Sequence, residues 1–345
     1  MQGKPPLDDA RILSCYITKE SVTGKLRQPR ILLPHPFQNP SQAIYSHSMN
    51  STTPIPSYPA NRPLELADKA FLDPIFTQMQ PSVSELTFAG LFLFRNAHDY
   101  RLTLVGDAPV VLGKGYAGDA YFLPPLAGDI AAALEVLFGS GLVLYGADQP
   151  FVNSYLVAAD LQVTEDRDAF DYLYLRGELA ELPGNRFHKK KNRVNYFTSR
   201  HDYEVDIFQP MHLDGALGLL AEWQRVRGND DNRSAVHEAS ATAEGLQLAP
   251  VLGLEGVTVL VGGAVAAFAL GERLNRETSV CHFEKSDPFM EGISQLVDQQ
   301  FNSLLFTDCL YVNREQDLGE SGLRAAKLSY HPVELVRKFR ARRIL

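Results

Sequence analysis

Short strand-like runs alternate with helix-like segments from Leu64 onward. No other feature of the sequence constrains the possible folds as strongly. Turn-forming residues separate strands expected at residues 100–105, 110–112, 121–123, 142–145 and 172–175, with helices expected at 67–78, 130–138 and 184–199. The rest of the chain repeats the pattern, with strands expected at 203–207, 257–261, 265–274, 278–284 and 309–312, and helices at 213–227, 236–248, 293–306 and 318–325. This mixture predicts an α/β (α+β) architecture used twice, each unit a mixed twisted sheet flanked by helices.

The length of 345 residues also suits two domains. We expect the first at residues 63–198 and the second at residues 199–345. Residues 1–62 are expected to form an extended or disordered leader, because prolines at positions 29, 34, 36, 40, 54, 56 and 59 exclude helices and central strands. Met49 is a candidate for the true start of translation.

Composition excludes several classes of protein. The 33 Lys and Arg residues against 41 Asp and Glu give a net charge of −8, which argues against a surface that coats nucleic acid but leaves room for a local basic patch. The longest weakly polar run, residues 257–270, is shorter than the ~20 residues of a membrane span, so no integral membrane segment is expected. Three cysteines without C-x-x-C spacing imply neither disulfides nor zinc, and a cytoplasmic location with no metal is expected.

Residues 113–118 match the dinucleotide-binding pattern G-x-G-x-x-G. That motif requires a helix to begin within it. The following residues, 119–125, are strand-like and end in two prolines. We therefore predict a glycine-rich turn between two strands.

A basic run follows Pro183. Between Arg186 and Arg193 there are five cations and no acid. Helical spacing places Phe187, Val194 and Phe197 on one buried face. The cations expected around the exposed face are Arg186, Lys189, Lys190 and Arg193. Such a helix either binds a polyanion or is a solvated charged surface.

Two further segments carry groups able to move protons. Glu272 ends one expected strand, and His282 and Glu284 are expected on one face of the next strand, so that carboxylate and imidazole could act as base and acid. The alternative is a structural ion pair. Near the end of the chain, Lys327, Tyr330 and His331 can each donate a proton or stabilise an oxyanion.

From about Pro63 to the end, the chain resembles the soluble bacterial proteins of the phosphatidylglycerol lysyltransferase C-terminal domain family. The segments that carry the resemblance are Tyr174-Leu175-Arg176, residues 183–197, 271–275, 282–287 and 313–332. The resemblance implies two tandem acyltransferase units of the Gcn5-related N-acetyltransferase type, akin to the Fem aminoacyl transferases that use charged tRNA. It also places Lys189–Arg193 on a basic helix between the units and Lys327 near the last strands of the second unit. The membrane-embedded half of the full lysyltransferases is missing, and residues 291–294 supply one glycine where acetyl-CoA users carry a fuller pyrophosphate loop.

The function expected from this resemblance is transfer of an acyl or aminoacyl group from tRNA or CoA to an amine or hydroxyl. The candidate catalytic residues are Lys327, Glu272, His282, Glu284 and Tyr330. The candidate donor-binding residues are Arg186, Lys189, Lys190, Arg193, Asn313 and Arg314. The alternative is a non-catalytic module that binds an anionic phospholipid headgroup or nucleic acid. The five cations in residues 337–343 would suit a role at the inner membrane surface, but we interpret them as a frayed, solvated end.

Overall fold

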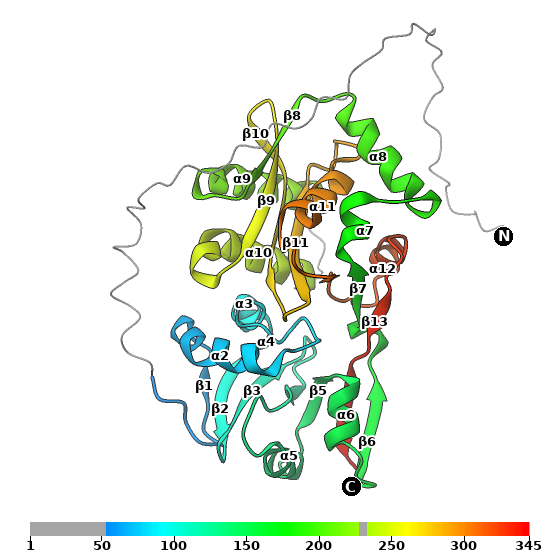
Figure 1. The fold of residues 1–345 in the computed structure, drawn as a ribbon. Coiled ribbons are helices and arrows are strands. Elements are labelled where there is room, and N and C mark those ends of the chain that lie inside the picture. Colours follow the sequence, from blue (N-terminus) through cyan, green and yellow to red (C-terminus); the bar gives the residue numbers. More distant parts are fainter. Residues whose placement is uncertain (1–52, 228–232, 345) are drawn as a thin grey trace, which may run out of the picture.

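The computed structural model describes residues 53–227 and 233–344 (Figure 1). The expectations for residues 1–52 and for a start at Met49 lie outside this part of the chain. Residues 53–61 run along the first sheet, where the Tyr58 amide donates to the Leu104 carbonyl at 2.8 Å and the Leu104 amide to the Pro56 carbonyl at 2.9 Å. The part of the expected leader that is described is therefore packed against the first unit.

The first sheet has seven strands. Their spatial order is β1 (Arg62–Pro63), β2 (Arg101–Val105), β3 (Ala108–Lys114), β4 (Ala120–Phe122), β5 (Val143–Ala147), β14 (Phe339–Arg343) and β6 (Leu161–Glu165). The pair β4–β5 is parallel, and the other neighbours are antiparallel. Helix α5 (Ile130–Gly139) buries Leu134 and Leu137 against Phe122 and Leu144 of the sheet, and α6 (Gln149–Tyr155) lies beside it. The glycine motif at residues 113–118 forms the predicted turn between β3 and β4.

The second sheet also has seven strands. Their spatial order is β13 (Glu334–Val336), β7 (Asp171–Leu175), β12 (Tyr311–Asn313), β11 (Thr278–Ser286), β10 (Ala264–Arg273), β9 (Glu255–Val261) and β8 (Tyr203–Ile207). Helices α7 (Arg176–Glu181), α8 (His188–Thr198) and α11 (Ile293–Leu304) pack on one face, and α9 (Leu213–Arg227) and α10 (Arg233–Leu252) on the other. The predicted fold class, two mixed sheets flanked by helices, is confirmed.

A shared core joins the two sheets. Helices α2 (Lys69–Met79), α3 (Phe88–Leu93) and α4 (Arg95–His98) lie between them in Figure 1. Leu91 of α3 is buried in one cluster with Leu102 of the first sheet and Phe268 and Phe283 of the second. The remaining helical elements are α12 (Ser321–Leu328) and the 3-10 turns Leu66–Asp68, Arg167–Ala169, Asn185–Phe187 and Pro210–His212.

The chain crosses between the sheets twice. Residues 62–165 build the first sheet, residues 171–336 build the second, and β14 then returns to the first. The boundary expected between residues 198 and 199 lies between α8 and β8, inside the segment that forms the second sheet. The interpretation of the basic end as frayed was wrong, because β14 is hydrogen-bonded between β5 and β6 and the Lys338 side chain is 0% exposed.

No helix among residues 53–227 and 233–344 combines the length and the apolar character that crossing a bilayer requires.

Candidate functional site

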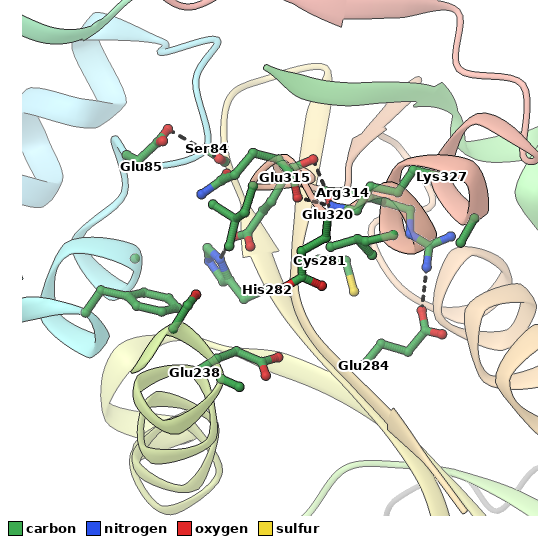
Figure 2. A pocket seen from close by; sticks show the side chains of 18 of the residues that line it. Ser84, Glu85, Glu238, Cys281, His282, Glu284, Arg314, Glu315, Glu320 and Lys327 are labelled. Atoms are coloured by element: carbon green, nitrogen blue, oxygen red, sulfur yellow. Dashed lines mark hydrogen bonds and ion pairs between the residues drawn. The ribbon is translucent and has the colours of Figure 1, made fainter. Parts of the chain in front are cut away.

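The site lies where the second sheet opens. Strand β12 pairs with β11 only over Thr278–Val280, so residues 281–286 continue without a partner strand on that side. The opening leads into a cavity of about 1000 Å³ between the two sheets, lined by residues of both units (Figure 2). The pairing of β10 with β11 is also irregular at this point. Leu270 pairs with Phe283 and Gly271 with Cys281, so His282 is an extra residue in β11.

His282 lies between two carboxylates. Its Nε2 is 2.9 Å from Glu272 Oε1 and its Nδ1 is 2.8 Å from Glu315 Oε1. Burial lowers the pKa of His282, but the two hydrogen-bonded carboxylates outweigh it and raise the pKa to about 10. Glu272 and His282 therefore lie within reach of each other, as expected, but the ring is an imidazolium at neutral pH and has no free nitrogen with which to accept a proton.

Glu284 lies apart from His282, because the extra residue breaks the strict alternation of side chains along β11. The two side chains point in different directions in Figure 2. Arg314 Nη2 donates to Glu284 Oε2 at 2.7 Å, and its Nη1 lies 3.1 Å from Asp298 Oδ1. Burial raises the pKa of Glu284 to about 7, although the Arg314 charge opposes this shift. A carboxylate with this pKa can exchange protons at neutral pH.

Lys327, on α12, acts on the neighbouring loop. Its Nζ donates to the carbonyl oxygens of Arg314 at 2.5 Å, Glu315 at 3.0 Å and Gln316 at 2.6 Å. An ammonium has three protons, so all its donors are used. Burial lowers the pKa of Lys327 to about 8. The geometry thus makes Lys327 a clamp on the loop that carries Arg314 and Glu315, with no proton left for an oxyanion.

Tyr330 is buried and lies between two cations. Lys190 Nζ is 3.7 Å from the centre of its ring, and Arg314 Cζ is 5.0 Å from it. Burial raises the pKa of Tyr330 well above its ordinary value, so the phenol stays protonated. Burial also lowers the pKa of Lys190. The ring thus holds Lys190 at the edge of the cavity.

The basic helix α8 packs as expected, with Phe187, Val194 and Phe197 buried. Its exposed side faces a second cavity of about 830 Å³, which we call the basic groove. The cations that line it are Arg186, Lys189, Lys190 and Arg193, and the other lining residues are 185, 286–288, 290–292, 294, 295, 329 and 331. Arg186 pairs with Glu178 and Arg193 with Glu291. Within the described ranges Lys189 has no ion-pair partner.

The basic groove and the central cavity share three lining residues, Lys190, Ser294 and Gln295. The last two lie in the first turn of α11, whose unpaired amide groups favour anions. Gly292 precedes this helix with φ of 94°, and a Cβ there would lie 2.1 Å from the Arg193 carbonyl oxygen. The glycine therefore allows α8 and α11 to meet at the groove.

Asn313 is placed away from the groove. It is fully buried and its Nδ2 donates to Asp171 Oδ2 at 2.9 Å, while its Oδ1 accepts from the Glu315 amide at 2.8 Å. Asp171 Oδ1 in turn accepts from Lys338 Nζ at 2.7 Å. The structure therefore brings Arg314 to the cavity, and makes Asn313 part of the scaffold behind it.

Several site residues were not identified from the sequence. Asp298 is the second carboxylate that pairs with Arg314. It belongs to three polar positions, 294, 298 and 302, which recur every fourth residue on the otherwise apolar face of α11. That spacing was a readable signal of a polar stripe facing the core. Glu315 follows β12 in a polar loop, where neither spacing nor composition distinguishes it from its neighbours. Glu85 lies in a loop before α3 and carries no local pattern.

Comparison with known proteins identifies the family of the chain. The model of the family described as "Phosphatidylglycerol lysyltransferase, C-terminal" matches residues 76–342. A conserved protein of unknown function from Bacteroides thetaiotaomicron VPI-5482 is 30% identical, with a TM-score of 0.75 over 81% of this chain and 98% of that one. The chain matched none of the curated proteins.

Two more distant structures share the fold. One is the C-terminal domain of a putative lysylphosphatidylglycerol synthetase from Agrobacterium fabrum, with 13% identity and a TM-score of 0.57 over 80% of this chain and 92% of that one. The other is L-PGS from Bacillus licheniformis, with 14% identity and a TM-score of 0.55 over 84% of this chain and 94% of that one. Since the family model covers well over half of the sequence, this protein belongs to the phosphatidylglycerol lysyltransferase C-terminal domain family.

Proposed function

We propose that this protein transfers an acyl or aminoacyl group from a phosphate-bearing donor, either an aminoacyl-tRNA or an acyl-CoA, to an amine or hydroxyl acceptor. Membership of the family supports an acyltransferase-like function. The observation that carries the proposal is the continuity of the basic groove with the cavity that holds Glu284. Donor phosphates in the groove would bring the reactive ester or thioester past Lys190 into the cavity.

Glu284 is the proposed general base. With a pKa of about 7 it accepts a proton from the attacking amine or hydroxyl as the new bond to the carbonyl carbon forms. The C–O bond to the ribose, or the C–S bond to CoA, then breaks, and the proton passes from Glu284 to the leaving group. His282 is excluded from this role by its two carboxylate partners. Tyr330 keeps its proton, and its side chain is hydrogen-bonded to Asp298, so it helps to position the Arg314 pair at the cavity.

The competing function is a non-catalytic module that holds an anionic ligand, a phospholipid headgroup or nucleic acid. The full use of the Lys327 protons and the two carboxylate partners of His282 favour it, since few groups are then left for chemistry. Such a module needs the basic groove and has no need of Glu284.

The test supplies the purified full chain with radiolabelled acetyl-CoA or with tRNA charged with labelled amino acids. The acceptors are phosphatidylglycerol vesicles or a mixture of primary amines. Labelled product from the wild type, lost about 100-fold or more in Glu284→Gln at unchanged donor affinity, supports the proposal. Glu135→Gln, outside the cavity, is the matched control. Binding without product in either assay assigns the module instead, and Lys189→Ala should lower the salt slope of binding by about one.

A further inference from the structure

We propose that Asp298 is a positioning residue for the proposed base: through Arg314, the cation that both acids share, it sets how readily Glu284 accepts a proton. That Glu284 acts as a base in transfer rests on the proposed function. The effect of Asp298 on Glu284 rests on three features of the structure: a shared cation, a fixed position for this cation, and unequal access of the two acids to the cavity.

Arg314 bridges two carboxylates that belong to different elements. Its Nη2 donates to Glu284 Oε2 on β11 at 2.7 Å, and its Nη1 lies 3.1 Å from Asp298 Oδ1 on α11. The guanidinium carries a single positive charge, so the two acids divide its attraction between them. Each acid therefore weakens the stabilisation that Arg314 gives to the ionised form of the other.

The groups that form the bridge are held in place from several sides. Arg314 Cζ lies 5.0 Å from the centre of the Tyr330 ring and 6.0 Å from that of Tyr174. On α11, Asn302 Nδ2 donates to the backbone carbonyl of Asp298 at 2.8 Å and lies 3.3 Å from its Oδ1. The guanidinium is thus fixed between the two acids, with one Nη atom directed at each.

The two acids differ in their access to the cavity. The Glu284 side chain is 20% exposed and lines the cavity, where Arg314 points toward it (Figure 2). The Asp298 side chain is 3% exposed and is not part of the cavity lining. Burial raises the pKa of Asp298 as well, so the two acids compete for a proton as they do for the cation. Asp298 can therefore act on Glu284 but not on a substrate.

Other titratable groups face Glu284 from its own strand and from the elements around it. The cations are Lys285 of the same strand, Lys327 of α12 and Lys190 of α8. Cys281 and Tyr330 are neutral at pH 7, because burial raises the pKa of both. In this set Asp298 is the only other carboxylate, so it supplies the like charge that opposes the cations.

Replacing Asp298 by asparagine removes this like charge and nearly conserves the volume of the side chain. Arg314 then acts on Glu284 alone, and the ionised form of Glu284 becomes more stable. We expect the pKa of Glu284 to fall from about 7 by about one pH unit. Glu284 would then accept a proton less readily, and it would be a weaker base.

The experiment follows the carboxyl carbon resonance of Glu284 by NMR in the full chain without substrate, after labelling with carboxyl carbon-13 glutamate. Glu284→Gln identifies the resonance by its loss. The titration midpoint should be lower in Asp298→Asn than in the wild type by about one pH unit. Asp308→Asn is the matched control, because Asp308 is 71% exposed and pairs with Arg273; its midpoint should equal that of the wild type.

A second variant covers the case in which Asp298→Asn does not fold. Asp298→Leu removes the same charge with an apolar side chain of similar size, a change that buried ionic sites often tolerate. It should lower the midpoint in the same direction. In the transfer assay, the midpoint of the pH–rate profile should fall by the same amount, which a purely structural role of Asp298 would not produce.

Two results would overturn the inference: a Glu284 midpoint that is unchanged or higher without the Asp298 carboxylate, or an equal shift in Asp308→Asn. The proposed function fails in a different assay. If the midpoint falls as expected but no donor yields product, the effect of Asp298 on Glu284 stands and the transferase proposal falls. If product forms while the midpoint and the pH–rate profile ignore Asp298, the transferase stands and the positioning role falls.

Discussion

Replacing Lys338 by methionine tests whether the buried ion pair at the crossing between the sheets holds the two units together. Lys338 and Asp171 are each 0% exposed, and their Nζ and Oδ1 atoms are 2.7 Å apart. Methionine keeps the length of the side chain and removes the charge, which leaves two buried carboxylates, Asp171 and Glu85, without their shared cation. Burial raises the pKa of Glu85, so this carboxyl can take up a proton once the cation is gone. Removing one partner of a buried pair costs about 3–5 kcal/mol.

The structure places the cost of Lys338→Met at the low end of that range, about 3 kcal/mol. Asp171 keeps three hydrogen bonds, from the Ser84 amide at 2.8 Å, the Ser84 hydroxyl at 2.9 Å and Asn313 Nδ2 at 2.9 Å. For a protein of this size such a loss lowers the melting temperature by about 6 °C. Differential scanning calorimetry at pH 7 measures it directly.

Arg337→Met is the matched control, one residue away along the chain. Arg337 pairs with Glu165, and both side chains are about half exposed, at 48% and 47%. An exposed pair of this kind contributes at most about 1 kcal/mol. Equal melting temperatures for the two variants would refute the reasoning. The double variant Lys338→Met with Asp171→Asn should lose less unfolding free energy than the two single variants added together. The reason is that the second change removes the Asp171 charge that the first leaves unpaired.

Three other outcomes follow from the site. Gly292→Ala should destabilise the protein and lower donor affinity, because the added Cβ would meet the Arg193 carbonyl; a variant with wild-type melting and binding would contradict this. The raised pKa of His282 means that its stabilising contribution is complete below pH 6.5 and is lost as pH rises toward about 10, so the stability gap between wild type and His282→Gln in urea titrations should shrink between pH 6 and 10. With a base of pKa about 7, the transfer rate should rise with pH and level off above 8, and a flat profile would remove Glu284 from that role.

Local periodicity was enough to predict the elements whose burial repeats along the chain. Phe187, Val194 and Phe197 recur on one side of the basic helix, and all three are buried where the spacing predicted. Short strands with mixed polarity were harder. In β14 only Phe339 and Ala341 point inward, and the three arginines between and after them hid the alternation.

The sequence predicted several residues of the candidate site, but not which of them contact one another. Strand alternation predicted His282 and Glu284 on one face, but the register shift opposite Leu270 and Gly271 separates their side chains. No pattern in the neighbouring residues predicts this shift. Arg314 was named, whereas its partner Asp298 lies sixteen positions earlier on another element. Contacts of this kind depend on how the sheets and helices pack, which the residue pattern along a single segment does not contain.

The position of β14 also fixes an order of events during synthesis. The strand is an interior strand of the first sheet, between β5 and the edge strand β6. It nevertheless leaves the ribosome after every strand of the second sheet. Until then the edges of β5 and β6 that it joins have no partner, and Asp171 has no cation. The amino-terminal unit therefore cannot finish folding ahead of the carboxyl-terminal one, so a nascent chain stalled before Phe339 would expose two unpaired strand edges to other chains.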